Sequence, residues 1–545
     1  MQITIGIDFG SDSVRAIAVD ARNGEVLGEG MGEYSRWKQR LYCDARQQIF
    51  RHHPLDYLEA MEAALHQTLS ALDHSQRSSV RAIGVDATGS TVCPVNENGV
   101  PLALLDSFAE DPDAMFHLWK DHSAAEEARE INAVFDRYRP FDYRCFQGDY
   151  SAEWFWAKIL HTVRNSERVR KAAITWVELA DWIPALLSGR THPSGLYRCV
   201  CAAGHKALWN SHFGGLPSME CLDQLDPYLG RLAQAYTRTP GMSTDVVGTL
   251  SREWQQRLSL PQTVLVGGSS LDAHAGAVGA GICPGTLVKV VGTSTVDMAV
   301  IAEEDLQGLH LKGVCGVAQN SILPGYVGLE AGQASFGDMF AWFVSLLSWP
   351  LGQDDAFSQT EKERILGGLL PRLEKKLLDD PNPGDVICLD WFNGRRYPTI
   401  KDGIRASVMG LTLGTDTPQF YRGLVCAAVM GSKSLFNGYQ KAGLKMSHII
   451  ATGGIAQKSS YVMQMLSDAL ERTVSVPRSQ QTCALGAAMY AAVACGIWEN
   501  LPHAQQHMGS GFARVYRPNA QRHARLEAYY QDYCRLAAFT DGWYQ

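Results

Sequence analysis

Two stretches of the sequence share one design: Ile3-Thr-Ile-Gly-Ile-Asp-Phe-Gly-Ser-Asp-Ser13 near the start and Leu287-Val-Lys-Val-Val-Gly-Thr-Ser-Thr-Val-Asp297 in the middle of the chain. In each, an apolar run predicts a buried strand, a turn of small residues follows, and a second strand begins. Such turns expose successive backbone N–H groups and let the backbone approach phosphate oxygens closely. The repeat therefore predicts two related lobes that grip one phosphate chain.

Asp8 lies at the end of the first of these strands. Asp is depleted in strands, so a carboxylate between Ile7 and Phe9 needs a reason. Next to Gly10, it is well placed to hold Mg²⁺ through water, as nucleotide sites commonly require. Either turn alone would more often be an ordinary hairpin, but the pair of turns favours a nucleotide site.

Size and charge narrow the class of protein. A chain of 545 residues and 59.9 kDa exceeds what one hydrophobic core usually supports, so two large domains are expected. The net charge is −8 and the sequence has no long Lys/Arg cluster, which argues against a nucleic-acid partner. Small anionic ligands must therefore be bound by local groups.

The remaining composition favours a cytoplasmic location. Thirteen cysteines are scattered, and the closest pair, Cys199-x-Cys201, has no second pair to complete a zinc site, so reduced thiols are expected. No basic segment precedes the first strand, so no signal peptide is expected. The longest uncharged Ala/Gly-rich run, 483–498, has 16 residues and predicts a buried helix, too short to span a membrane.

Strands and helices alternate along the chain, which predicts an α/β fold. We expect a hairpin over 3–20, an amphipathic helix over 54–65 and a core strand over 80–86 that ends in a second carboxylate. The final region, from Tyr421 onward, is expected to be helical apart from a strand at 448–452.

A domain boundary is expected near Cys283-Pro-Gly285, just before the second strand–turn–strand unit. It divides the chain into residues 1–284 and residues 285–545. Residues 106–260 mix helices with aromatic-rich segments and are interpreted as an insertion on the first lobe. Without a low-complexity linker, the lobes are expected to join through short hinges and to close on their ligands.

Five motifs follow one another along the chain: Gly6-Ile-Asp-Phe-Gly10, Gly84-Val-Asp-Ala-Thr-Gly-Ser-Thr91, Asp272-Ala-His274 with Gly279-Ala-Gly281, Gly292-Thr-Ser294, and Ala451-Thr-Gly-Gly454. In this order and spacing they resemble the FGGY family of carbohydrate kinases, within the actin/hexokinase/Hsp70-like ATPase superfamily. Further segments are most similar to the ribulokinases of that family: Ser11-Asp-Ser-Val-Arg15, Arg51-His-His-Pro54, Leu118-Trp-Lys-Asp-His122, Ser151-Ala-Glu-Trp154, Ala203-Gly-His-Lys206, Gly328-Leu-Glu-Ala-Gly-Gln333 and Leu389-Asp-Trp-Phe-Asn-Gly-Arg395.

The resemblance implies a fold and an activity. The implied fold is two ribonuclease-H-like, actin-like ATPase domains with the active-site cleft between them. The implied activity is that of an ATP-dependent carbohydrate kinase that converts a 2-ketopentose, L-ribulose, to L-ribulose 5-phosphate in L-arabinose catabolism. Its cofactors would be ATP and Mg²⁺ and its partners small molecules, with a homodimer as an open alternative to a monomer.

Asp272 is the candidate catalytic base. It follows the apolar run 264–268 and begins a small-residue segment, where a strand gives way to a helix. From the residues alone, a role as N-cap of a helix over 273–278 is about equally favoured. The resemblance favours catalysis, because the family's base precedes the paired glycines. Such a carboxylate would orient the sugar hydroxyl and accept its proton as the bond to phosphorus forms.

The resemblance assigns ATP binding to the two turns and to the glycine pair after the strand at 448–452, with these residues: Gly10, Ser11, Asp12, Ser13, Gly292, Thr293, Ser294, Gly453, Gly454 and Gln457. Ser459 departs from the family pattern, since related proteins usually carry Asn there. A side-chain amide from Gln457 or Gln464 is a candidate replacement.

For the sugar, the resemblance indicates Gly89, Trp119, Lys206, Asp272 and Glu330. A polyol presents alternating donors and acceptors, so a lysine donates, carboxylates accept, and a tryptophan offers an apolar wall. Lys206 as a surface charge, Trp119 as core and Glu330 as an ion-pair partner remain open. His52-His53 and His274 lack a second matching cluster for a metal and are interpreted as structural.

Three other classes compete with this interpretation. A related kinase could act on xylulose, xylitol, erythritol or glycerol, but the segment 86–91 lacks the Gln-containing loop expected of xylulose and glycerol kinases. A non-kinase actin-like ATPase would need a peptide-binding or polymerising module, and no such segment is apparent. A sugar-sensing protein without activity need not retain both Asp8 and Asp272.

Overall fold

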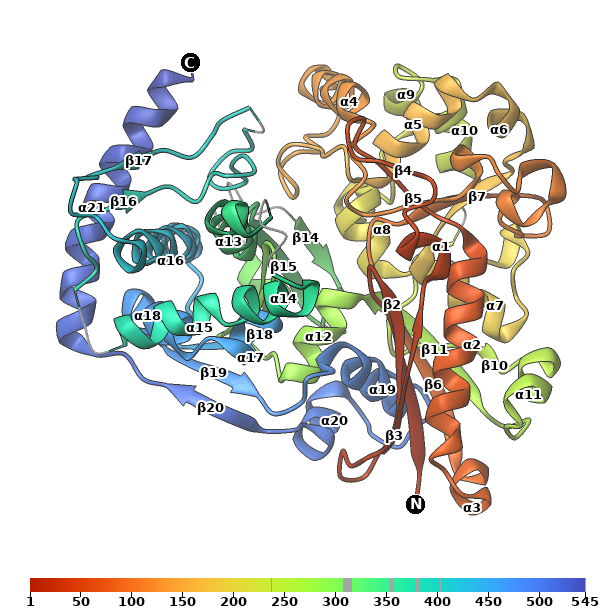
Figure 1. The fold of residues 1–545 in the computed structure, drawn as a ribbon. Coiled ribbons are helices and arrows are strands. Elements are labelled where there is room, and N and C mark those ends of the chain that lie inside the picture. Colours follow the sequence, from red (N-terminus) through yellow and green to blue (C-terminus); the bar gives the residue numbers. More distant parts are fainter. Residues whose placement is uncertain (237, 307–315, 353–356, 379–381, 402, 545) are drawn as a thin grey trace.

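The computed structural model describes residues 1–236, 238–306, 316–352, 357–378, 382–401 and 403–544, and it contains two large β-sheets (Figure 1). The first sheet consists, in spatial order, of β10 (Val246–Thr249), β11 (Leu265–Leu271), β6 (Val80–Ala87), β1 (Ile3–Phe9), β2 (Ser13–Asp20) and β3 (Val26–Glu33). The second consists of β14 (Gly316–Gln319), β15 (Val327–Gln333), β13 (Thr295–Ile301), β12 (Thr286–Val291), β18 (His448–Thr452), β19 (Thr473–Pro477) and β20 (Phe512–Tyr516).

The two sheets repeat one topology. In the first, β1 pairs antiparallel with β2 and parallel with β6. In the second, β12 pairs antiparallel with β13 and parallel with β18. The order β3-β2-β1-β6-β11 therefore corresponds to β15-β13-β12-β18-β19. This confirms the α/β class, and β1 and β2 form the hairpin expected over 3–20.

Helices α12 (Asp272–Ala280) and α19 (Thr482–Ala494) pack against each other between the two sheets (Figure 1). Their backbones approach so closely that a Cβ atom on Gly486 would lie 1.9 Å from the carbonyl oxygen of Ala275. Any side chain at that position would force the helices apart. The buried helix predicted at 483–498 is confirmed as α19, which ends at Ala494.

A third, smaller sheet lies beside the first and contains β4 (Cys43–Asp44), β5 (Ile49–His52), β8 (Phe116–His117), β7 (Val92–Val95) and β9 (Thr175–Glu178). Near it lie α4 (Ala125–Arg137), α5 (Phe155–Asn165), α6 (Glu167–Ala172), α9 (Met219–Leu222) and α10 (Pro227–Ala235). Two helices of the same region pack mainly against the large sheets: α7 (Leu179–Ser188) against β11 and β6, and α8 (Val200–Ala207) against β14 and β11. This accessory layer overlaps the range 106–260 without coinciding with it, because β4, β5 and β7 precede that range and β10 belongs to the first sheet.

The other α-helices and the remaining short strands are α1 (Ser35–Lys38), α2 (Pro54–Ser70), α3 (His74–Ser78), α11 (Arg252–Leu258), α13 (Gly337–Gly352), α14 (Gln359–Gly367), α15 (Leu369–Leu377), β16 (Ile387–Cys388), β17 (Val408–Met409), α16 (Thr417–Lys441), α17 (Gly454–Lys458), α18 (Ser460–Leu470), α20 (Leu501–Met508) and α21 (Ala520–Trp543). The helix expected at 54–65 is confirmed as α2, which extends five residues further, to Ser70.

The expectation that the region after Tyr421 holds a single strand is wrong. β19 and β20 follow β18 and extend the second sheet to its edge. The residues of β20 are almost all exposed, so the strand has no alternating burial that its sequence could reveal. Its existence depends on backbone pairing with β19, which is set by the tertiary fold.

Two further observations concern the described residues. None of their helices combines the length and the apolar character needed to cross a membrane. The cysteines among them are free thiols, and of these only Cys145 and Cys283 are exposed.

Candidate active site

Three carboxylates meet where strands of the first sheet end. β1 and β6 run parallel with Asp8 opposite Asp86, and Asp272 begins α12 directly after β11, the next strand in the sheet. Carboxyl ends of parallel strands lie along one edge of a sheet, which is where open α/β folds place their ligands. Asp86 is fully buried and Asp8 is 6% exposed, whereas Asp272 keeps a partly exposed edge.

Burial and mutual repulsion both disfavour charge on this cluster. Burial, and then the charges of Asp8 and Asp272, hold the pKa of Asp86 well above its usual range. Burial and then Asp8 raise the pKa of Asp272 to about 7. The carboxyl group of Asp86 contacts that of Asp8, and neither of its oxygens has a further hydrogen-bond partner among the described residues. Oxygen ligands of like charge with unmet bonding capacity fit a divalent cation.

Asp272 is not the N-cap of its helix. Leu271 occupies the cap position, and Asp272 is the first helical residue. Its Oδ1 accepts a hydrogen bond at 2.7 Å from the N–H of the adjacent Ala273, not from a residue further into the turn. Asp272 is therefore one residue past the cap position that the sequence left open, although it does accept the N–H of Ala273, and the carboxyl group remains partly exposed.

Each of the two small-residue turns is closed by a backbone hydrogen bond that its glycine donates, although the second turn is one residue shorter. In the first, the N–H of Gly10 donates to the carbonyl of Ser13 at 3.1 Å, and in the second, Gly292 donates to Ser294 at 3.0 Å. The indole of Trp119 donates to Ser11 Oγ at 2.8 Å. Trp119, expected at the sugar, thus also touches the first phosphate-turn candidate.

The glycine pair lies beside the second turn. Gly453 has φ +92° and a Cβ atom there would lie 2.6 Å from the carbonyl oxygen of Val291, the residue before Gly292. Only glycine fits this conformation and this approach. Gly454 then begins α17 with open space around it. The predicted adenosine glycines and the predicted phosphate turn are therefore adjacent.

Lys206 and Glu330, two of the residues predicted to bind the sugar, lie together with His274. Lys206 Nζ lies 3.0 Å from Glu330 Oε1, and His274 Nε2 lies 3.0 Å from Glu330 Oε2. Lys206 is only 6% exposed, so it is not a surface charge. Burial would raise the pKa of Glu330, but Lys206 and His274 hold it well below the usual range. The partners lie on α8, α12 and β15, and α12 also carries Asp272.

Gly89 lies two residues after the end of β6. It is partly exposed, and a Cβ atom there would lie 2.2 Å from Leu271 Cδ2, immediately before Asp272. A side chain at this position would therefore displace the residue that leads into the candidate base.

Lys158, which the sequence analysis did not identify, holds two segments of the predicted sugar site together. Lys158 is fully buried on α5, and its ammonium donates to the carbonyl oxygens of Ser90 at 2.7 Å and Leu118 at 2.8 Å. It thereby ties the Gly89 loop to the segment that carries Trp119. No pattern in the sequence marks Lys158, because it lies within an otherwise apolar helical stretch.

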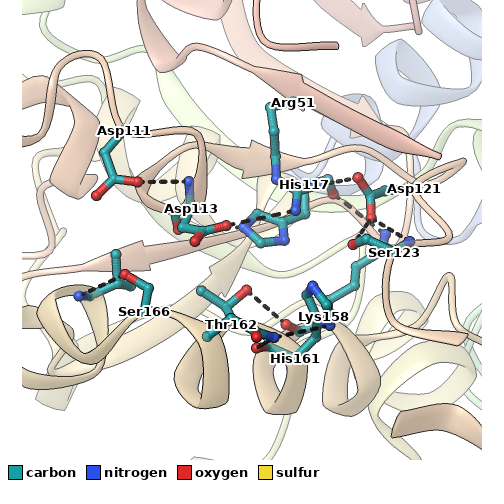
Figure 2. A network of polar contacts seen from close by, with 12 residues as sticks. Arg51, Asp111, Asp113, His117, Asp121, Ser123, Lys158, His161, Thr162 and Ser166 are labelled. Carbon is teal, nitrogen blue, oxygen red and sulfur yellow. Dashed lines mark hydrogen bonds and ion pairs between the residues drawn. The ribbon is translucent and has the colours of Figure 1, made fainter. Parts of the chain in front are cut away.

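A second contact, between Arg51 and Asp121, involves a residue two positions after Trp119 (Figure 2). Their side chains form a buried ion pair, and Asp121 also accepts from the N–H of Phe50 at 2.7 Å. Both residues occur in segments that resemble the ribulokinases, so those segments serve in part to position Trp119.

The three histidines that were interpreted as structural from the sequence have different contacts in the structure. His52 contacts the hydroxyl of Tyr57 and His53 caps α2, which confirms that interpretation for both. His274 instead contacts Glu330. Together with His205 these two residues place three potential metal-ligand atoms within 4.8 Å.

That histidine cluster is better explained by ion pairing than by a metal. The ammonium of Lys206 already occupies one oxygen of Glu330, and a cation there would be repelled. His205 Nε2 lies 2.9 Å from Ser321 Oγ and is engaged with that hydroxyl.

One carboxylate links the accessory layer to the second half of the chain. Glu153 Oε1 lies 3.0 Å from His122 Nε2 and 3.3 Å from Arg396 Nη2. Burial would raise the pKa of Glu153, but Arg396 and His122 lower it to about 2. The accessory layer and the second half of the chain therefore meet through a charged contact.

Comparison with known proteins decides the family. The model of the FGGY family of carbohydrate kinases, C-terminal domain, matches residues 287–495. A ribulokinase from Vibrio parahaemolyticus is 41% identical and aligns with 99% of this chain and 97% of its own length. The chain belongs to the FGGY carbohydrate kinase family, in its ribulokinase group. A ribulokinase from Shouchella clausii is 32% identical, over 98% of this chain and 94% of that protein.

Solved structures confirm the fold that the resemblance implied. A xylulose kinase from Rhodospirillum rubrum superimposes with a TM-score of 0.79 at 18% identity, over 99% of each chain. The chain thus has the two-domain actin-like ATPase fold, and the family makes it an ATP-dependent carbohydrate kinase.

The departure at Ser459 has a local explanation. Ser459 caps α18 through Val462 N and donates to Glu374 Oε1 at 2.8 Å. The two proposed replacements are also engaged with protein: Gln457 donates to the carbonyl of Pro477 at 3.1 Å, and Gln464 to Asp468 at 2.9 Å. The serine therefore caps α18, the second helix after the glycine pair.

Proposed function

We propose that this member of the family transfers the γ-phosphoryl group of ATP to the terminal 5-hydroxyl of L-ribulose, a step of L-arabinose catabolism. The observation that supports this most directly is the position of Asp272, between the strand-end carboxylates and the Lys206–Glu330 ion pair. Relatives named ribulokinases align along nearly the whole chain. A buried lysine and a carboxylate suit a ketose that offers several hydroxyls in fixed positions.

In this proposal the chain positions two substrates and moves one proton. The turns at Gly10–Ser13 and Gly292–Ser294 hold the phosphates with backbone N–H groups, and Gly453-Gly454 approaches the adenosine. Asp272 orients the 5-hydroxyl and accepts its proton as the oxygen bonds to phosphorus. Closure around the sugar excludes water, which would otherwise compete for the phosphoryl group.

Mg²⁺ fits the carboxylate cluster. Asp8 and Asp86 would hold it, Asp8 through water, because their oxygens are buried, repel one another and include two without other partners among the described residues. A bound Mg²⁺ supplies positive charge against the charge that develops on the transferred phosphoryl group.

The substrate assignment is tested by coupled ADP release across a panel of ketopentoses and polyols. L-Ribulose is expected to give the highest kcat/KM, because a site built to hydrogen-bond several hydroxyls strongly rejects analogues that lack one. A much better rate with D-xylulose, xylitol, erythritol or glycerol would reassign the substrate within the family.

Lys206→Ala is expected to lower kcat/KM for L-ribulose about 10²-fold, because it removes a donor to the sugar and also leaves Glu330 with one partner fewer. The KM for ATP is expected to change little. Lys433→Ala is a matched control: Lys433 is also buried and paired, with Glu527 at 2.9 Å, but far along the chain. Equal losses in the two variants, or a raised KM for ATP, would remove Lys206 from sugar recognition.

We place the domain boundary between residues 284 and 285 and the hinge at Cys283-Pro-Gly285, where Gly285 has φ +81°. Each domain contributes one of the two phosphate turns, so neither domain alone forms the complete phosphate-binding site. L-Ribulose together with a non-hydrolysable ATP analogue is therefore expected to reduce the radius of gyration in small-angle scattering, and the sugar alone is expected to leave the protein partly open. An unchanged profile with both ligands at saturation would contradict the closure step.

A further inference from the structure

The carboxylate of Glu330 is held by two cationic side chains from different helices. Lys206 on α8 approaches Oε1, and His274 on α12 approaches Oε2, each at 3.0 Å. Glu330 itself lies on β15 of the second sheet. His274 therefore joins the helix of the candidate base to the strand that presents a sugar-site carboxylate.

The surroundings of His274 favour a charged imidazole. The side chain is completely buried, and its ring contacts the ring of His205 edge-on with 4.8 Å between centroids. Burial alone would lower the pKa of His274, but Cys201 and Glu330 raise it to about 9. An imidazolium that donates to a carboxylate forms a shorter and stronger hydrogen bond than a neutral pair.

We infer that His274 is a positioning residue for sugar recognition: its Nε2–H holds the Glu330 carboxylate ionised and in one orientation, so that its remaining acceptor sites face the ketose hydroxyls. The inference rests on the proposed function. A carboxylate with both oxygens anchored loses little freedom when a sugar binds, which lowers the cost of binding. His274 touches no reacting atom and acts only through Glu330.

His274→Gln is expected to raise KM for L-ribulose about 10- to 100-fold, the size of a lost hydrogen bond to a charged group, with KM for ATP nearly unchanged. His274→Asn removes the same charge with a shorter side chain and provides a second variant if the first does not fold. The matched control is His52→Gln, because His52 is equally buried but contacts the hydroxyl of Tyr57 and lies on a different element from the Glu330 ion pairs.

A double-mutant cycle decides whether His274 acts through Glu330. In the Glu330→Gln background, His274→Gln is expected to change KM for the sugar by no more than about twofold, because the group it positions is already gone. Full additivity of the two substitutions, or an unchanged sugar KM in a folded His274 variant, would overturn the inference. The substrate panel on the wild-type protein tests the proposed function separately, and the cycle uses whichever ketose that panel selects.

Discussion

Asp272→Asn is expected to lower kcat by about 10²–10⁴-fold, the usual size of a general-base contribution, while L-ribulose binding is nearly unchanged. The amide has the shape of the carboxyl group but cannot accept the hydroxyl proton. It can still accept the hydrogen bond that Ala273 N–H gives to Oδ1, so the start of α12 should remain intact. Single-turnover kinetics and calorimetric titration of the sugar separate the two effects.

Asp416→Asn is the matched control for this substitution. Like Asp272, Asp416 lies at the start of a helix. It is the N-cap of α16 and accepts a hydrogen bond from the N–H of Gln419 at 2.9 Å. Because asparagine is an equally good cap, neither turnover nor stability should change. An Asp272→Asn enzyme with near wild-type turnover would exclude Asp272 as the base.

The pH dependence should identify the same group. A base must be deprotonated to act, so kcat/KM falls as the pH drops through its pKa in the free enzyme. Burial, and then the charge of Asp8, raise the pKa of Asp272 to about 7, well above that of an ordinary carboxyl group. The acidic limb of the wild-type profile is therefore expected above the usual carboxyl range, and the residual activity of Asp272→Asn should lack it.

The duplicated fold could be predicted from the sequence because its signal is local. β1 and β12 are short apolar runs that end in small-residue turns, and each turn leads directly into its antiparallel partner. β20 could not be predicted, since its exposed residues show no alternation and its hydrogen bonds come from β19. Edge strands of this kind are set by the rest of the sheet.

The candidate site likewise contains residues that local sequence signals predict and residues that only the tertiary fold brings together. Asp8 and Asp272 stand at strand ends that the sequence reveals. Asp86 was recognised as a strand-end carboxylate, but its position opposite Asp8 depends on the parallel register of β1 and β6. Lys158 and His274 gain their roles only from burial against segments distant in sequence, with partners 40 and 56 residues away. No spacing rule brings such pairs together.

Asp8→Ala is expected to reduce Mg²⁺-dependent turnover severely, by about 10²-fold or more at moderate Mg²⁺, with little effect on sugar binding. Asp8 lies with Asp86 at the strand ends and has only Arg15, at 3.8 Å, as an ion-pair partner among the described residues. A cation would therefore be its principal partner, whereas the sugar-site ion pair lies on other elements. The measurement is kcat against free Mg²⁺, with the sugar affinity determined in parallel.

Asp20→Asn is the matched control, because Asp20 is a buried carboxylate at the opposite end of the same hairpin and pairs with Arg22 at 3.4 Å. It should leave the Mg²⁺ dependence unchanged. Mg²⁺ alone should also raise the melting temperature of the wild-type protein, since a ligand that binds only the folded state stabilises it and this one would relieve repulsion among Asp8, Asp86 and Asp272. Asp8→Ala should lose that shift. If the variant kept both the shift and the wild-type Mg²⁺ dependence, the metal would have to be held elsewhere, and the strand-end carboxylates would need another explanation for their burial.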